Sequence, residues 1–167
     1  DCYVTGQGFF GGGLGDDDVD GGKTTLRTAI FDLSGGDATV RYWRWYSNAT
    51  SASPAADVFV VDVSNDGGTS WTNVEVVGPG GPEVVGGWFQ HSFRVSDFVT
   101  PTANMRMRFV ASDEGDGSIV EAAIDDFEIL RFDCTEVCQT DLGFAGPGNA
   151  IFAVCGEPLD SGNSATM

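Results

Sequence analysis

The sequence predicts an all-β protein, an antiparallel β-sandwich of the jelly-roll type followed by a C-terminal segment of different character. Two observations predict this fold. Apolar residues nowhere form a helical stripe over a dozen positions without interruption by Gly, Pro or a cluster of Asn, Asp and Ser. Short β-branched and aromatic segments instead recur at close spacing between turn residues, which is typical of sandwiches and jelly rolls.

The expected strands are rich in β-branched and aromatic residues and end at turn residues. They are 24–31, 38–46, 57–64, 71–77, 88–95, 105–111 and 118–132. Alternation is clearest in 105–111, where Met105, Met107 and Phe109 share one face and the arginines share the other. We therefore expect the sandwich to comprise residues 1–132. Residues 133–167, rich in Gly, Pro, Asn and Ser, predict a truncated second module or an extended arm.

The chain is strongly acidic, with 25 acidic and 8 basic residues and a net charge of -17. This charge argues against nucleic acid as a partner, since phosphate binding needs cationic patches, and against anionic membrane surfaces. No apolar stretch approaches the ~20 residues of a membrane span, so no membrane insertion is expected. Crowded carboxylates repel one another, and either bound divalent cations or a solvated surface suited to high salt would relieve that repulsion.

The loop 16–22 is the densest acidic segment, with alternating aspartates before Gly21-Gly22. Calcium takes about six to eight oxygen ligands, and such a loop can wrap around the ion. Strand parity puts Asp125 on the apolar face of Phe127 and Ile129, where a carboxylate needs a cation or several donors. The predicted Ca²⁺ ligands are Asp16, Asp18, Asp20 and Asp125. The alternative is an ion-free acidic turn.

A second acidic loop covers residues 113–118. It either holds another ion, joins the first site, or is a solvated hairpin loop.

Aromatic residues concentrate in the segment 42–46. Trp43 and Trp45 lie on one face of the expected strand and Tyr42 and Tyr46 on the other, so one pair faces the core. The outward pair is a candidate platform for saccharide stacking, and Trp88 with His91 is an alternative platform. The candidate glycan contacts are Trp43, Trp45 and Trp88. Packing in the core is the competing interpretation.

The segment 64–71 resembles the Asp box of sialidases, with Ser70 in place of Thr, but it occurs once. We interpret it as a structural hairpin turn capped by its aspartate. Catalytic machinery is scarce: the one histidine, His91, has no serine or cysteine elbow nearby. Carboxylates are too abundant to identify a glycosidase pair. We therefore expect no enzyme activity in this chain.

Four cysteines allow three disulfide pairings. The spacing of the second and third, without histidine partners, does not fit a zinc site. We favour two disulfides, which imply an oxidising compartment and a secreted protein, over four free thiols. The chain also begins at Asp1 without a methionine, as a mature or excised piece would. The favoured pairs are Cys2–Cys134 and Cys138–Cys155.

Residues 18–26, 42–48, 64–71 and 120–126 together resemble accessory jelly-roll domains of large secreted bacterial hydrolases such as zinc carboxypeptidase-like proteins. The strand around Asp125 is also similar to the last strand of MAM-type and galactose-binding-like sandwiches, where an aspartate contributes to a calcium site. Residues 138–156 look like the start of a short tail module. The chain departs from the family in lacking a strand before Cys2 and in its truncated tail.

The resemblance implies an accessory binding or stabilising role. The leading hypothesis is a non-catalytic, secreted, calcium-binding sandwich that binds polysaccharide or cell-surface glycan. The first alternative is a structural subunit that self-associates through edge strands by strand exchange, with 150–154 as a donor segment. The second is a carboxylate-dependent glycan hydrolase domain.

Overall fold

A computed structural model describes residues 2–6, 8, 11–13, 15–16, 18–19, 21–114 and 117–131. The expectations for residues 133–167 lie outside the described residues, as do those for Asp20.

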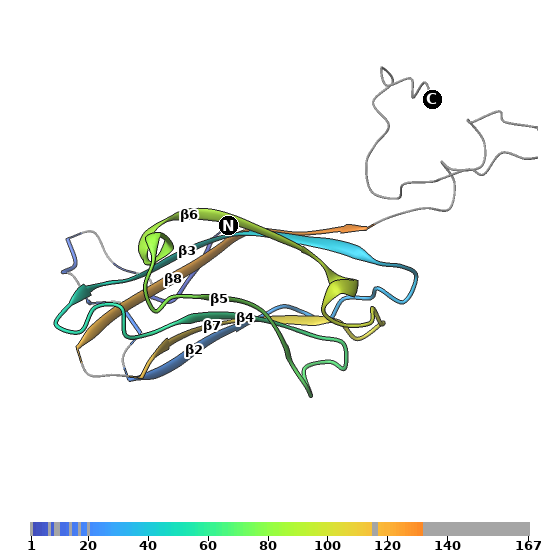
Figure 1. Ribbon diagram of the computed structural model, residues 1–167, viewed down its shortest axis with the longest axis horizontal. Coiled ribbons are helices and arrows are strands. Elements are labelled where there is room, and N and C mark those ends of the chain that lie inside the picture. The colour runs from blue at the N-terminus through green and yellow to red at the C-terminus, as the bar shows by residue number, and fades with distance from the viewer. Residues whose placement is uncertain are drawn as a thin grey trace, which may run out of the picture.

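Two four-stranded antiparallel sheets face each other across the core (Figure 1). The first has the order β1-β8-β3-β6 and the second the order β2-β7-β4-β5. This order is that of a jelly roll, and it confirms the predicted fold class. The strands are β1 (Tyr3–Val4), β2 (Gly22–Arg27), β3 (Ala38–Ser51), β4 (Phe59–Ser64), β5 (Thr72–Val77), β6 (Val85–Arg94), β7 (Arg106–Asp113) and β8 (Ser118–Arg131).

Helical structure in the described residues is limited to two 3-10 turns, η1 (Pro82–Val84) and η2 (Val95–Asp97). No helix in this part of the chain is long and apolar enough to cross a membrane.

The core lies between the sheets and follows the alternation of the strands. In β3 the tyrosines Tyr42 and Tyr46 point inward and are fully buried. In β7 the inward residues are Met107 and Phe109, while Arg108 lies on the opposite face over the ring of Trp71. The sequence prediction for this strand is therefore confirmed.

β8 is one long strand interrupted by a β-bulge at Asp126, whose φ is 47°. Ile124 is buried before the bulge and Phe127 packs on the core after it. Even-numbered residues therefore face the core before the bulge, and odd-numbered residues face it afterwards. Asp125 pairs with Trp43 of β3 and lies on the outer face. The parity argument that put Asp125 on the face of Phe127 is therefore wrong, because the extra residue shifts the alternation.

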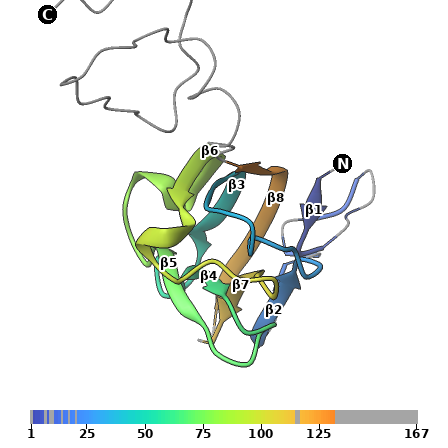
Figure 2. The same cartoon turned by 90° about the vertical axis from the view of Figure 1, so that its right-hand side faces the viewer.

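The N-terminal residues form β1, a strand that the sequence did not predict. Tyr3 pairs with Ile124 and Val4 with Ala123 of β8. Figure 2 shows β1 and β2 on one side of the sandwich and β5 and β6 on the other. Since β1 has only two residues, Tyr3 and Val4 are 62% and 52% exposed, and this side is weakly covered.

The hairpin between β4 and β5 is the predicted structural turn. Asp66 Oδ1 accepts the hydroxyl of Ser64 at 2.7 Å and the amides of Thr69 and Ser70 at 2.9 Å each. The hydrogen bonds from Ser70 hold the pKa of Asp66 well below its usual range. A capped turn of this kind fixes the register of the two strands.

Candidate functional site

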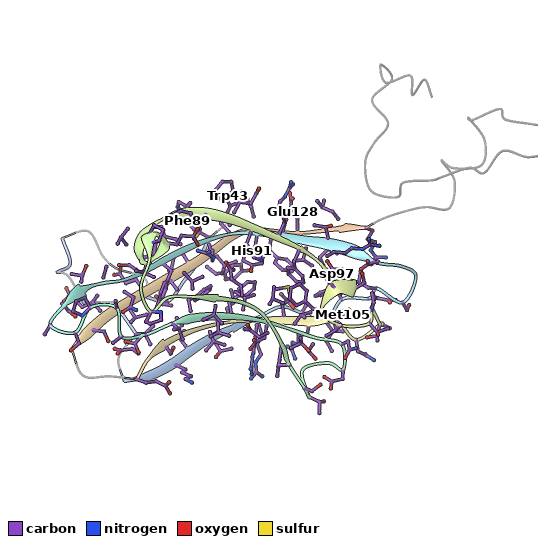
Figure 3. The ribbon with its side chains drawn as sticks, viewed as in Figure 1. Trp43, Phe89, His91, Asp97, Met105 and Glu128 are labelled. Carbon is purple, nitrogen blue, oxygen red and sulfur yellow. The ribbon has the colours of Figure 1, made fainter. Side chains whose placement is uncertain are left out.

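The outer face of the first sheet carries a cluster of tryptophans. Trp45 of β3 pairs directly across the sheet with Trp88 of β6, and Trp43 pairs with Gln90. Trp88 is 44% exposed, while Trp43 and Trp45 are half-buried. Figure 3 shows Trp43 on the side of the sheet away from the core. The two platforms that the sequence offered as alternatives therefore form one surface, although His91 does not belong to it.

A groove runs beside this tryptophan pair toward the N-terminal edge. Ala123 of β8 faces Trp45, and its small side chain leaves the depression between β3 and β1. The groove has a volume of about 280 Å³. Its lining residues come from β1, β3, β6, β8 and the turn after β1, and are Cys2, Val4, Thr5, Gly6, Trp45, Trp88, Glu121, Ala122 and Ala123.

Gly86 holds the indole of Trp45 in position. A Cβ at Gly86 would lie 2.9 Å from Cζ2 of Trp45, closer than carbon atoms approach in proteins, and its φ of 84° also favours glycine. Between the pairs Trp45–Trp88 and Ser47–Val85, β6 has one residue more than β3, so Gly86 lies in a bulge. Without a side chain at Gly86, the indole can lie close to the backbone of the bulge.

The polar groups around the groove are acidic or neutral. Glu121 lines it, and the hydroxyl oxygen of Thr5 accepts the amide of Ala122 at 3.1 Å. Two arginines on this face are paired with carboxylates: Arg41 contacts Glu128 with Nε 3.0 Å from Oε2, and Arg94 contacts Asp37. The surface therefore combines exposed aromatic rings with hydrogen-bonding groups and no excess of positive charge.

Behind the tryptophans, on the inner face, a buried ionic cluster braces the two sheets. Glu75 of β5 accepts the Tyr42 hydroxyl at 2.8 Å, Arg44 Nε at 2.8 Å and His91 Nδ1 at 3.2 Å. Arg44 also contacts Glu83 of η1. Burial would raise the pKa of Glu75, but the hydrogen bonds from His91 and Arg44 and their charges lower it to about 2. His91 is thus a structural residue (Figure 3).

The residues of the predicted calcium site are distributed over two places. Asp16 accepts the amide of Gly13 at 2.6 Å, and the amide of Val19, next to Asp18, donates to Val120 O at 2.9 Å. Asp125 lies five residues after Val120 in β8, which is about 16 Å along the strand axis.

The structure therefore does not bring Asp125 to the loop that holds Asp18. The described residues contain no group of three or more His, Cys, Asp or Glu able to hold a metal. A calcium ion bound by the loop 16–22 itself stays a prediction, because Asp20 lies outside the described part of the chain.

Cys2 is exposed and has no disulfide partner among the described residues. Burial, followed by the charge of Asp125, raises the pKa of this thiol. The favoured partner and the second pair lie outside the described residues, so both disulfides stay predictions. Those residues are Cys134, Cys138 and Cys155.

No protein-family model and no curated protein matches the chain. Among solved structures, the chain is similar to TmCBM61 in complex with beta-1,4-galactotriose, with 15% identity and a TM-score of 0.42 over 69% of this chain and 68% of that chain. It is also similar to a structure described under "CBM4 structure and function", with 12% identity and a TM-score of 0.35 over 65% of this chain and 60% of that chain. At this degree of likeness neither structure assigns a ligand to the chain.

Proposed function

We propose that this chain is a non-catalytic carbohydrate-binding module of a secreted protein, and that polysaccharide binds on Trp45 and Trp88. The observation that carries the proposal is their cross-strand pairing on an open face beside a groove. Indole rings offer a flat apolar surface to the C–H face of a sugar, while nearby polar groups take its hydroxyls. A paired aromatic surface left open to solvent is otherwise unfavourable, and it marks an interaction site.

The charge of the face favours neutral polysaccharides. The chain carries a net charge of -17, and Glu121 lies in the groove itself. Arg41 is held by Glu128 and is not available to pair with a uronic acid. Acidic sugars would therefore be repelled, while neutral chains meet no electrostatic penalty.

Titration with soluble polysaccharides tests this function. Galactan, xylan and mixed-linkage β-glucan represent neutral chains, and polygalacturonate represents acidic ones. We expect at least one neutral chain to change the tryptophan fluorescence and to release heat, and polygalacturonate to do neither. In a Trp88→Ala variant the affinity should fall about 30-fold, as for loss of an aromatic residue worth about 2 kcal/mol.

Trp71→Ala is the matched control for this titration. Trp71 packs with Arg108, 4.6 Å from guanidinium carbon to ring centroid, and belongs to the second sheet's side of the molecule. This variant should keep the wild-type affinity. Equal losses in Trp88→Ala and Trp71→Ala, or no binding of any neutral chain by the wild type, would contradict the proposal.

Self-association is the second candidate function, favoured by the thinly covered side between β1 and β2. A hollow there is lined largely by apolar side chains, among them Tyr3, Ile30 and Phe31, and has a volume of about 570 Å³. A strand from a second copy would cover it and pair with the edge. Light scattering over a range of concentrations tests this: a dimer that Tyr3→Asp abolishes supports the candidate, and a constant monomeric mass rejects it.

A further inference from the structure

Two buried carboxylates meet at the end of the sandwich where β7 turns into β8. Asp57 precedes β4 and Asp113 ends β7, and they are 6% and 4% exposed. Both contact the hydroxyl of Ser118, the first residue of β8: Oγ is 2.6 Å from Asp57 Oδ2 and 2.7 Å from Asp113 Oδ1. Asp57 Oδ1 also accepts the amide of Glu114 at 2.9 Å.

The two contacts of the Ser118 hydroxyl need two hydrogen atoms, but only one is present. A serine hydroxyl carries a single proton and can donate it to one carboxylate at a time. The other contact then places two oxygens at hydrogen-bond distance with no hydrogen between them. The ion pairs formed by Lys, Arg and His in the described part of the chain involve other carboxylates, so no basic side chain there neutralises Asp57 or Asp113.

Two buried neutral oxygens near Asp57 provide a second, independent observation. Tyr46 and Asn48 are fully buried, and neither the Tyr46 hydroxyl nor Asn48 Oδ1 has a hydrogen-bond partner among the described residues. The Tyr46 ring lies beside the segment that holds Asp57, because Asp57 O and Tyr46 Cε1 lie 2.8 Å and 3.6 Å from the position that a Cβ on Gly78 would take. Asn48 Nδ2 donates to Asp57 O at 2.6 Å, which fixes the amide beside the same residue.

We propose that Asp57, Asp113 and Ser118 bind a calcium ion, with the oxygens of Tyr46 and Asn48 lining the site. Two carboxylates neutralise a divalent cation, and a cation held by three oxygens removes the need for a second proton among them. Calcium accepts about six to eight oxygen ligands in irregular geometry, including neutral ones. Magnesium fits less well, because it demands a regular octahedron and loses its water reluctantly.

This site is separate from the calcium site predicted at loop 16–22 and from the tryptophan face, and two of its residues belong to the acidic loop 113–118. It has two carboxylates and neutral oxygens, and the described residues contain no group of three or more His, Cys, Asp or Glu that could hold a metal. An ion here would join the β7–β8 hairpin to the segment before β4. It would therefore stabilise the fold and leave the polysaccharide surface unchanged.

Calcium titration of protein stripped with a chelator tests the proposal. We expect calcium at a hundredfold excess over its dissociation constant to raise the melting temperature by about 5–10 °C. Asp113→Asn should weaken calcium binding at least about tenfold, because a charged ligand is lost. Asp62→Asn is the matched control: Asp62 is also buried but pairs with Arg108 at 2.7 Å, so this variant should lose stability and keep the calcium shift.

Several outcomes would overturn the proposal. If calcium leaves the melting temperature of the wild type unchanged, no calcium ion binds these three oxygens. If Asp113→Asn keeps the full calcium shift while Asp18→Asn or Asp125→Asn loses it, the ion binds elsewhere. If Asp113→Asn does not fold, Ser118→Ala and calorimetric calcium titration replace it, and unchanged affinity in Ser118→Ala rejects the ligand set. A calcium-grown crystal without an anomalous peak at Asp57 Oδ2 would reject it as well.

Discussion

Replacing Glu75 by Gln should destabilise the sandwich more than any surface substitution. Its carboxylate is the common acceptor for Tyr42, Arg44 and His91, and the side chains of Glu75 and Arg44 are only 10% and 5% exposed. The amide removes the charge and leaves the Arg44 guanidinium buried. Glu83 also contacts Arg44 but is 41% exposed, so it compensates in part. Breaking a buried pair on one side costs about 3–5 kcal/mol, and we expect the lower end of that range.

Urea unfolding measures this loss. At an m-value of about 1–3 kcal/mol/M, a loss of about 3 kcal/mol lowers the midpoint by about 1–3 M with the slope unchanged. Glu128→Gln is the control, because its pair with Arg41 is exposed on both sides and should contribute less than about 1 kcal/mol. Equal midpoints for wild type and Glu75→Gln would refute the view that this cluster braces the sheets.

The pH dependence of the unfolding free energy also tests the role of Glu75, because its lowered pKa fixes the direction of the change. The pKa of Glu75 is lowered from an ordinary 4.5 to about 2 in the folded state. Its contribution to stability is therefore complete above pH 4.5 and is lost as the pH falls toward 2. The difference in unfolding free energy between wild type and Glu75→Gln should be constant above pH 4.5 and shrink below it.

Three further substitutions test other parts of the account. Gly86→Ala should displace the indole of Trp45 and weaken polysaccharide binding, seen as a lower affinity in calorimetry, whereas unchanged affinity would show that the indole position does not matter. Asp66→Ala should lower the urea midpoint by uncapping the β4–β5 hairpin, with polysaccharide affinity as the property that stays constant. Tyr42→Phe removes one hydrogen bond to a carboxylate and should cost about 1.5–3 kcal/mol, and a neutral effect in thermal melting would contradict the assignment.

The sequence predicted the sandwich because inward and outward residues alternate regularly along the strands that build the core. Met105 and Met107 are inward, and the inward tyrosines leave Trp43 and Trp45 on the outer face. The two-residue period of a strand shows directly which side chains share a face. It could not show that Trp88 lies opposite Trp45, because pairing between β3 and β6 depends on register over about 40 residues of intervening chain.

The same reasoning failed at Asp125 for an identifiable reason. A single residue in the left-handed region, Asp126, inserts a bulge and reverses the parity that the argument assumed. Nothing in an Asp-Asp pair signals such a bulge. The sequence pointed to Asp113 and Ser118 through the acidic loop 113–118, but not to Asp57, because 56 positions separate it from Asp113 and only the fold brings both carboxylates to Ser118.

The indole N–H resonances, followed during titration with a fragment of a neutral polysaccharide that binds, test directly whether Trp45 and Trp88 form the binding surface. We expect the signals of Trp45 and Trp88 to move together with the same affinity, while that of Trp71 stays in place. If Trp71 moves and the pair on β3 and β6 does not, the outer face of the first sheet is not the binding surface.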